Sequence, residues 1–169
     1  MMTALIGNDV STSLRCRLLN IDFSETVSDK FSGPKWGSEG IRKLTGVYNR
    51  PLVLNMIKPC TGFPPKAGAE FFYASALGGV DIIKDDELLG DTAFSPSEER
   101  VRLYLQAAKR VYEEKGTYTH YCVNVSGKVQ RLLDTAQRCI DAGAKMLMIN
   151  HVTMGLDSLY ALSETVGSK

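Results

Sequence analysis

The sequence has no uninterrupted apolar run near the ~18 residues that a membrane-spanning helix needs. It also has no excess of one charge, since 20 lysines and arginines stand against 19 aspartates and glutamates. The near-neutral balance removes the electrostatic reason to expect nucleic acid or an anionic membrane as a partner. The start of the chain lacks the basic and apolar regions of a signal peptide, so we expect a cytoplasmic protein.

Cysteine is scarce, and the four that are present show no short paired spacing of the zinc-binding or redox kind. Cys16, Cys60, Cys122 and Cys139 are therefore expected to be reduced thiols, with Cys139 in the core. The remaining composition, 44% hydrophobic and 23% charged, is that of an ordinary globular protein. A length of 169 residues is typical of a single domain.

Short apolar segments alternate with stretches in which apolar residues recur at helical spacing. The apolar segments predict strands over 52–58, 79–84, 119–125 and 145–150, and the periodic stretches predict helices over 65–77, 96–115, 129–140 and 156–166. Ser95 to Glu98 has the pattern of a capping box at the start of the second helix, and Gly116 is a fitting stop for it. This alternation indicates an α/β fold with a parallel sheet. A closed (β/α)8 barrel takes eight such units and about 250 residues, so four units predict its first half.

The segment from Gly78 to Glu87 reads as a buried strand that ends in four consecutive charges. Lys84 and Asp86 fall on one side of the strand, with Glu87 at the turn, while Asp85 falls on the other side, where a salt bridge to a helix is expected. Two carboxylates are suitable ligands for Mg²⁺, and a deprotonated lysine can add CO2 to give a carbamate oxygen. The alternative is a strand end held together by salt bridges.

In a parallel barrel, functional side chains gather where the strands end. The polar residues at the predicted strand ends are Lys58, Lys84, Asp86, Glu87, Asn124, Asn150 and His151. Their convergence favours a catalytic site at this edge of the sheet. A lone histidine at such a position is more often structural.

Three motifs give the chain a family resemblance. The pattern Gly-Gly-x-Asp-x-x-Lys-Asp-Asp-Glu at 78–87 closely resembles the metal-site strand of the RuBisCO large-chain superfamily. The segment 50–59, which ends in Ile-Lys-Pro, resembles the first barrel strand of that family, and 6–8 resembles the Gly-Asn near the end of its N-terminal domain. The resemblance implies that 1–30 is the tail of a small α+β N-terminal domain and that 31–169 is the N-terminal half of the barrel.

The same resemblance implies a site. Lys84, as the carbamate formed with CO2, would bind Mg²⁺ together with Asp86 and Glu87. Lys58 would act on protons, with its pKa lowered by the neighbouring Mg²⁺. Asn124 would orient the ligands or cap the next helix. Asn8 would lie against the active site of a second subunit, which implies a homodimer acting on a small phosphorylated sugar.

Two departures separate the chain from true carboxylases. Cys60 stands where they carry a second lysine, and Met56 where they carry a threonine. These changes favour the RuBisCO-like (form IV) proteins, and the resemblance then implies a Mg²⁺-dependent enolase or isomerase of the methionine-salvage type that forms a metal-stabilised enediolate. Three alternatives stay open: ribulose-bisphosphate carboxylase, a decarboxylase of a 3-oxo sugar-acid phosphate, and a non-catalytic truncated fragment.

Overall fold

The computed structural model describes residues 19–30 and 35–166. The chain divides into two units, residues 1–35 and 36–169. The described part of the first unit contains the short helix α3 (Glu25–Ser28), and all the other described helices and strands belong to the second unit. Asn8 lies outside the described residues, as do the flanking residues of its motif. The assignment of 1–30 to a separate domain stays a prediction.

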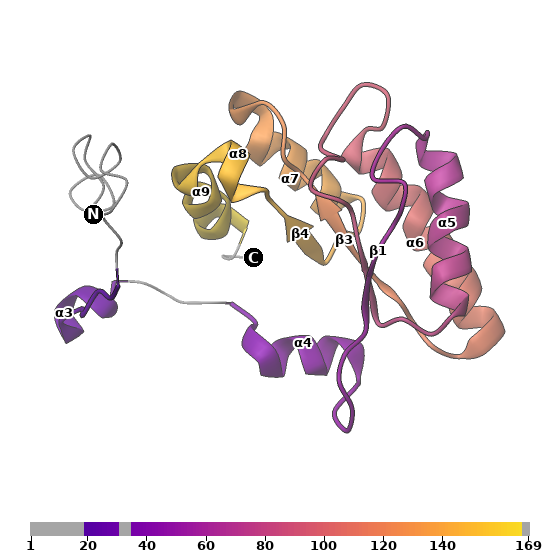
Figure 1. The fold of residues 1–169 in the computed structure, drawn as a ribbon, viewed down its shortest axis with the longest axis horizontal. Coiled ribbons are helices and arrows are strands. Elements are labelled where there is room, and N and C mark those ends of the chain that lie inside the picture. The colour runs from indigo at the N-terminus through magenta and orange to yellow at the C-terminus, as the bar shows by residue number, and fades with distance from the viewer. Residues whose placement is uncertain (1–18, 31–34, 167–169) are drawn as a thin grey trace. The chain divides into compact units, whose positions relative to one another are not determined.

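The second unit is built around a parallel sheet of four strands in the order β1-β2-β3-β4 (Figure 1). The strands are β1 (Leu54–Met56), β2 (Ile82–Lys84), β3 (His120–Asn124) and β4 (Met146–Met148). In the register of the sheet Met56 pairs with Lys84, Lys84 with Cys122, and Cys122 with Met146. The predicted strand order and direction are confirmed, although the strands are shorter than the apolar segments that predicted them.

Helices occupy the connections between the strands, as the sequence predicts. These are α5 (Pro65–Leu77) after β1, α6 (Ser97–Lys115) after β2, and the 3-10 turn η1 (Val129–Arg131) with α7 (Leu132–Asp141) after β3. Helix α4 (Gly37–Thr45) precedes β1, and α8 (His151–Met154) and α9 (Leu156–Val166) follow β4. Helix α6 ends at Gly116, whose φ of 71° is in the left-handed region that glycine adopts without strain. Among the described helices, none is long and apolar enough to cross a membrane.

The start of α6 differs from the prediction. No side chain caps the helix in the manner of a Ser95–Glu98 capping box, and Pro96 precedes the first helical residue. The backbone N–H of Ser97 instead donates to Asp91 Oδ1 at 2.9 Å. The capping acceptor therefore comes from six residues upstream, where the loop folds back toward the helix.

One face of the sheet packs against α5, α6 and α7, and this layer contains the core (Figure 1). Ile83 of β2 and Tyr121 and Val123 of β3 are almost completely buried there, because alternate residues of a strand face the same side. Cys139 of α7 is fully buried, which confirms its predicted place in the core. On the opposite face, the in-register residues Met56, Lys84, Cys122 and Met146 are all partly exposed.

Candidate active site

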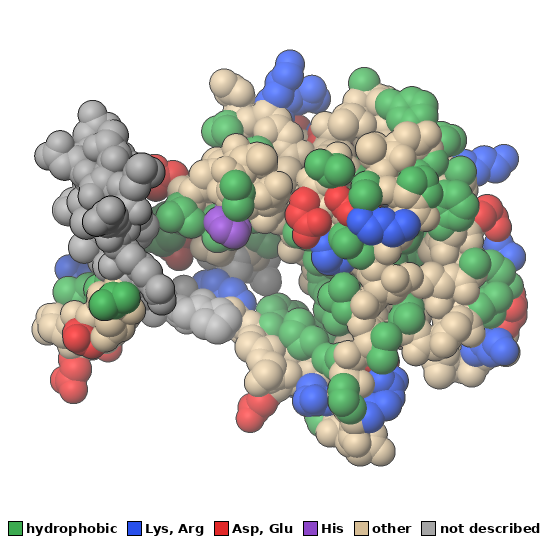
Figure 2. Space-filling model, viewed as in Figure 1, with side chains coloured by type: hydrophobic (Ala, Val, Ile, Leu, Met, Phe, Trp, Pro, Cys, Tyr) green, Lys and Arg blue, Asp and Glu red, His purple; other side chains and the backbone are tan. Residues whose placement is uncertain are grey.

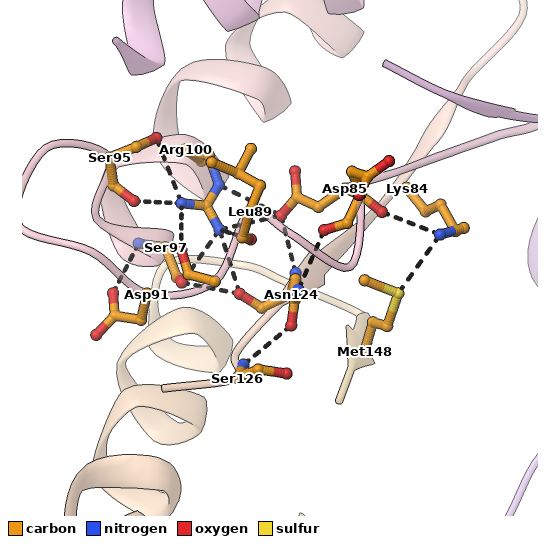
Figure 3. A network of polar contacts seen from close by, with 12 residues as sticks. Lys84, Asp85, Leu89, Asp91, Ser95, Ser97, Arg100, Asn124, Ser126 and Met148 are labelled. Carbon is orange, nitrogen blue, oxygen red and sulfur yellow. Dashed lines mark hydrogen bonds and ion pairs between the residues drawn. The ribbon is translucent and has the colours of Figure 1, made fainter. Parts of the chain in front are cut away.

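The predicted metal ligands lie together where β2 ends. Lys84 Nζ donates to Glu87 Oε1 at 2.7 Å and to the carbonyl of Asp85 at 3.1 Å. Met148 of β4 brings its sulfur to 3.7 Å from the same nitrogen (Figure 3). The Lys84 side chain is 19% exposed and that of Glu87 is 50% exposed. The site is thus half-open, with an amine and a carboxylate in direct contact.

Lys58 joins this group from the end of the neighbouring strand. Its Nζ lies 2.6 Å from Asp86 Oδ2, and its own side chain stays 55% exposed. The register accounts for the contact, because Met56 pairs with Lys84 and each of the two charged residues lies two positions further on. In space-filling view, acidic and basic side chains adjoin near the centre of this face (Figure 2).

The ion pair between Lys58 and Asp86 shifts both pKa values. The hydrogen bond from Lys58 is the largest cause that lowers the pKa of Asp86 to about 2, and the amide of Leu88 adds to it. The same hydrogen bond raises the pKa of Lys58, with a smaller contribution from Cys60. An ammonium beside a carboxylate keeps its proton, so the lowered pKa that we expect of Lys58 next to Mg²⁺ stays a prediction.

Cys60 contacts the site through Lys58. The Lys58 Nζ lies 3.0 Å from Cys60 Sγ, and the cysteine is partly exposed. Among the interactions of the described residues, no imidazole contacts the thiol. Cys60 therefore lies beside Lys58 at the edge of the candidate site.

Asn124 fixes the backbone of the turn that carries the two acidic residues. Its side-chain amide is fully buried and donates to the carbonyls of Asp86 at 3.1 Å and Glu87 at 3.3 Å. Its Oδ1 accepts from the backbone N–H of Ser126 at 3.0 Å (Figure 3). These contacts favour the orienting role over the helix-capping role. Asn124 acts on the acidic residues through their backbone.

Asp85 points to the opposite side of β2, into the core, and confirms the expected salt bridge with a helix. Its carboxylate lies 3.1 Å from Arg100 Nη2 of α6, and both side chains are at most 1% exposed. Tyr121 donates its hydroxyl to the same carboxylate at 2.7 Å. The backbone N–H of Asn124 donates to it at 2.8 Å (Figure 3). Burial raises the pKa of Asp85, and Arg100 and the Asn124 amide oppose that rise.

Arg100 is the residue that the sequence analysis missed. Its guanidinium also donates to the backbone carbonyls of Leu89, Gly90, Ser95 and Asn124. A signal was present, because Arg100 precedes Tyr104 by four residues and Ala108 by eight, on the buried stripe of α6. A charged residue on such a stripe indicates a buried partner.

The pair at the end of β4 has no contact with the predicted ligands. Asn150 caps α8, since its Oδ1 accepts from the backbone N–H of Val152 at 3.1 Å. His151 is the exposed first residue of that helix. The arrangement agrees with a structural role for this pair.

The donor set suits a hard divalent cation in part. Within residues 19–30 and 35–166, no group of three or more histidine, cysteine, aspartate or glutamate side chains is arranged to hold a metal ion. Asp86 and Glu87 supply carboxylate oxygens, which Mg²⁺ prefers, whereas a lysine amine is not such a ligand. A third protein oxygen at this place would have to come from Lys84 as a carbamate.

Comparison with known proteins identifies the family. Residues 38–168 match the sequence pattern of the ribulose bisphosphate carboxylase large chain, catalytic domain. A ribulose bisphosphate carboxylase-like protein of Archaeoglobus fulgidus is 43% identical over 164 residues, which are 97% of this chain and 37% of that protein. The 2,3-diketo-5-methylthiopentyl-1-phosphate enolase of Geobacillus kaustophilus is 40% identical over 148 residues, covering 88% of this chain and 36% of the enolase.

Solved structures agree with the sequence comparison. The rubisco-like protein of Alicyclobacillus acidocaldarius superposes with a TM-score of 0.75 and 38% identity, over 82% of this chain and 35% of that one. A dimeric archaeal Rubisco from Hyperthermus butylicus gives a TM-score of 0.78 and 29% identity, over 84% and 34%. The chain thus spans about a third of the length of these relatives, and its sheet is the first half of their barrel. It belongs to the RuBisCO large-chain family, and its relatives include RuBisCO-like proteins.

Proposed function

We propose that this chain carries the metal-binding half of a Mg²⁺-dependent enolase that acts on 2,3-diketo-5-methylthiopentyl 1-phosphate or a close phosphorylated diketo sugar. The observation that carries the proposal is the group formed by Lys84, Asp86 and Glu87 at the end of β2, with Lys58 2.6 Å from Asp86. Several curated relatives that share 37–40% identity with this chain are named as enolases for that compound.

The metal would be held by Asp86, Glu87 and the carbamate of Lys84. Bound Mg²⁺ would polarise the substrate carbonyl and stabilise the negative charge of the enediolate. The carbamate of Lys84 would lie beside the other proposed ligands, since its side chain is 19% exposed and in contact with Glu87. Asn124 would keep both acidic residues in place through their carbonyls.

Lys58 is the proposed proton-transfer residue. Enolisation removes a proton from a carbon next to a carbonyl and returns a proton to the carbonyl oxygen, so it needs a side chain that can hold and release one. Lys58 lies beside the proposed ligands and remains open to a substrate on its exposed side. Asn8 of a second subunit would complete the site in a homodimer.

The carboxylase alternative is disfavoured by the surroundings of Lys58. Cys60 lies 3.0 Å from its Nζ, where a second lysine would otherwise add positive charge. Met56, two residues before Lys58, has no hydroxyl group that could contact a substrate. A pocket for a bisphosphate would need more cations than the described residues supply at this point.

A chimera tests the proposal. The corresponding third of the Geobacillus kaustophilus enolase would be replaced by this chain, and enolisation of 2,3-diketo-5-methylthiopentyl 1-phosphate would be followed by absorbance with Mg²⁺ and bicarbonate. We expect activity that Lys84→Ala abolishes and that Lys66→Ala, which changes an exposed lysine of α5, retains. A folded chimera that is inactive on this substrate would overturn the substrate assignment.

Carbamylation has a separate readout. With ¹³C-bicarbonate and Mg²⁺, the 169-residue protein should show a carbamate signal in its ¹³C NMR spectrum. The signal should be absent in Lys84→Ala and present in Lys66→Ala. A carbamate signal that persists in Lys84→Ala would contradict the proposed ligand set.

A further inference from the structure

A polar pocket lies apart from the residues of the proposed active site. It has a volume of about 390 Å³ and lies between the β2–α6 loop and the segment that follows β3. Asp91 and Thr92 line it on the loop side. Lys128, Arg131 and Arg138 line it on the other side, from the β3–η1 loop, η1 and α7. None of the proposed ligands takes part in this pocket.

The cations around the pocket are only partly balanced. Arg138 forms ion pairs with Glu98 at 3.3 Å and Asp134 at 3.2 Å. Lys128 and Arg131 are exposed, and neither side chain forms an ion pair or hydrogen bond with any residue in the described ranges 19–30 and 35–166. Two unpaired positive charges three residues apart repel each other, and an anion between them would relieve that repulsion.

The single carboxylate in the pocket lining, that of Asp91, already accepts two hydrogen bonds. Asp91 Oδ1 accepts from the backbone N–H of Ser97 at 2.9 Å, and Asp91 Oδ2 accepts from Thr135 Oγ1 at 3.3 Å. These two bonds hold Asp91 to the starts of α6 and α7. Thr92 Oγ1 accepts from the backbone N–H of Ser95, so its hydroxyl proton remains able to donate to a ligand.

We propose that this pocket binds the phosphoryl group of a small molecule. The guanidinium of Arg131 and the ammonium of Lys128 on one wall suit a tetrahedral oxyanion, because arginine donates two parallel hydrogen bonds to such a group. A volume of about 390 Å³ is within the size range of pockets for small metabolites. All the lining residues come from this chain, between Asp91 and Arg138, so the pocket is independent of the proposed metal site and of the enolase activity.

Calorimetric titration of the 169-residue protein with inorganic pyrophosphate tests this proposal. The buffer would contain EDTA and no bicarbonate, so that the Mg²⁺ site does not contribute. We expect saturable binding of one equivalent. Lys128→Ala/Arg131→Ala should weaken it by at least tenfold, since each lost charge-assisted hydrogen bond accounts for about a factor of ten or more.

The matched control is Lys109→Ala/Lys115→Ala, which removes two exposed cations of α6 outside the pocket. It should bind pyrophosphate as the parent does. A melting-temperature increase with pyrophosphate in the parent and the control, and none in the pocket variant, would support the same site. Equal binding by all three proteins, or no saturation in the parent, would overturn the proposal.

Discussion

Lys58 and Asp86 form an ion pair of 2.6 Å between the ends of two adjacent strands, with Asp86 almost buried and Lys58 half-exposed. The pair links β1 to the turn that follows β2, and both partners belong to the proposed site. Each charge stabilises the other, so the pKa of Asp86 is lowered and that of Lys58 is raised. The arrangement places one positive charge against the acidic turn that follows β2.

Removal of the Lys58 charge should raise the pKa of Asp86. In Lys58→Met the largest cause of the depression is lost, and the pKa should rise from about 2 toward its ordinary value of 3.8. An NMR titration of the side-chain carboxyl carbons would measure it. Lys66→Met serves as control because Lys66 is exposed on α5. An unchanged Asp86 titration in Lys58→Met would show that the Leu88 amide is sufficient.

The buried pair of Asp85 and Arg100 should matter far more for stability than an exposed pair of the same type. Arg100→Met leaves a buried carboxylate without its cation and should lower the free energy of unfolding by about 3–5 kcal/mol. Arg102→Met breaks an exposed pair with Glu98 and should cost at most about 1 kcal/mol. Urea denaturation of both variants checks the difference. Similar losses would contradict the role assigned to burial.

The hydroxyl of Tyr104 is buried and has no hydrogen-bond partner among the described residues. Tyr104→Phe should therefore raise the free energy of unfolding by about 1 kcal/mol, since an unpaired buried polar group is costly. Gly68 of α5 faces this hydroxyl, and a methyl group at Gly68 would collide with it. Gly68→Ala should thus be destabilising, and Tyr104→Phe should recover part of the loss. Thermal melting of the two single variants and the double variant would measure the coupling; simple additivity would count against the contact.

Stability should also depend on pH through His120. Burial lowers the pKa of His120 below its ordinary value of 6.5, and the neighbouring Lys145 adds to this, while the Leu44 carbonyl and Asp81 act in the opposite direction. The unfolded chain therefore binds the proton more readily than the folded chain. Stability is full above about pH 6.5 and falls as the pH drops through that value toward the folded pKa.

His120→Gln provides the comparison, because glutamine can still donate to the Leu44 carbonyl but does not titrate. Its free energy of unfolding should change less between about pH 7.5 and pH 5.5 than that of the parent. Urea denaturation at several pH values measures both slopes. Equal slopes would assign the pH dependence to other groups.

The sequence predicts much of the fold because the signals were local. Apolar segments and helical periodicity gave the order of the four strands and their helices, and Gly116 gave a correct stop for α6. The predictions failed where contacts between residues distant in the sequence determine the local structure. The capping acceptor of α6 is Asp91 because the loop folds back, and no pattern within Ser95–Glu98 contains that information.

The positions of the charged residues in the candidate site were also partly predictable. The charges at the end of the strand predicted that Lys84, Asp86 and Glu87 lie where β2 ends, and the alternation of side chains along the strand correctly predicted that Asp85 faces the core. The contact between Lys58 and Asp86 was not predicted, because it depends on the register between β1 and β2, which a single strand does not specify. Arg100 was missed because a charged residue within an amphipathic helix is usually assigned to the exposed face.

The backbone N–H of Asn124 donates to the buried carboxylate of Asp85, and this bond limits how the turn that follows β2 can move. This N–H has no solvent-exposed route for exchange, and its acceptor is also held by α6 and β3. Opening of the acidic turn therefore requires the core itself to open, so the amide proton of Asn124 should exchange with deuterium as slowly as the most protected amides of the sheet. We therefore expect the turn that carries Asp86 and Glu87 to move little unless the core opens.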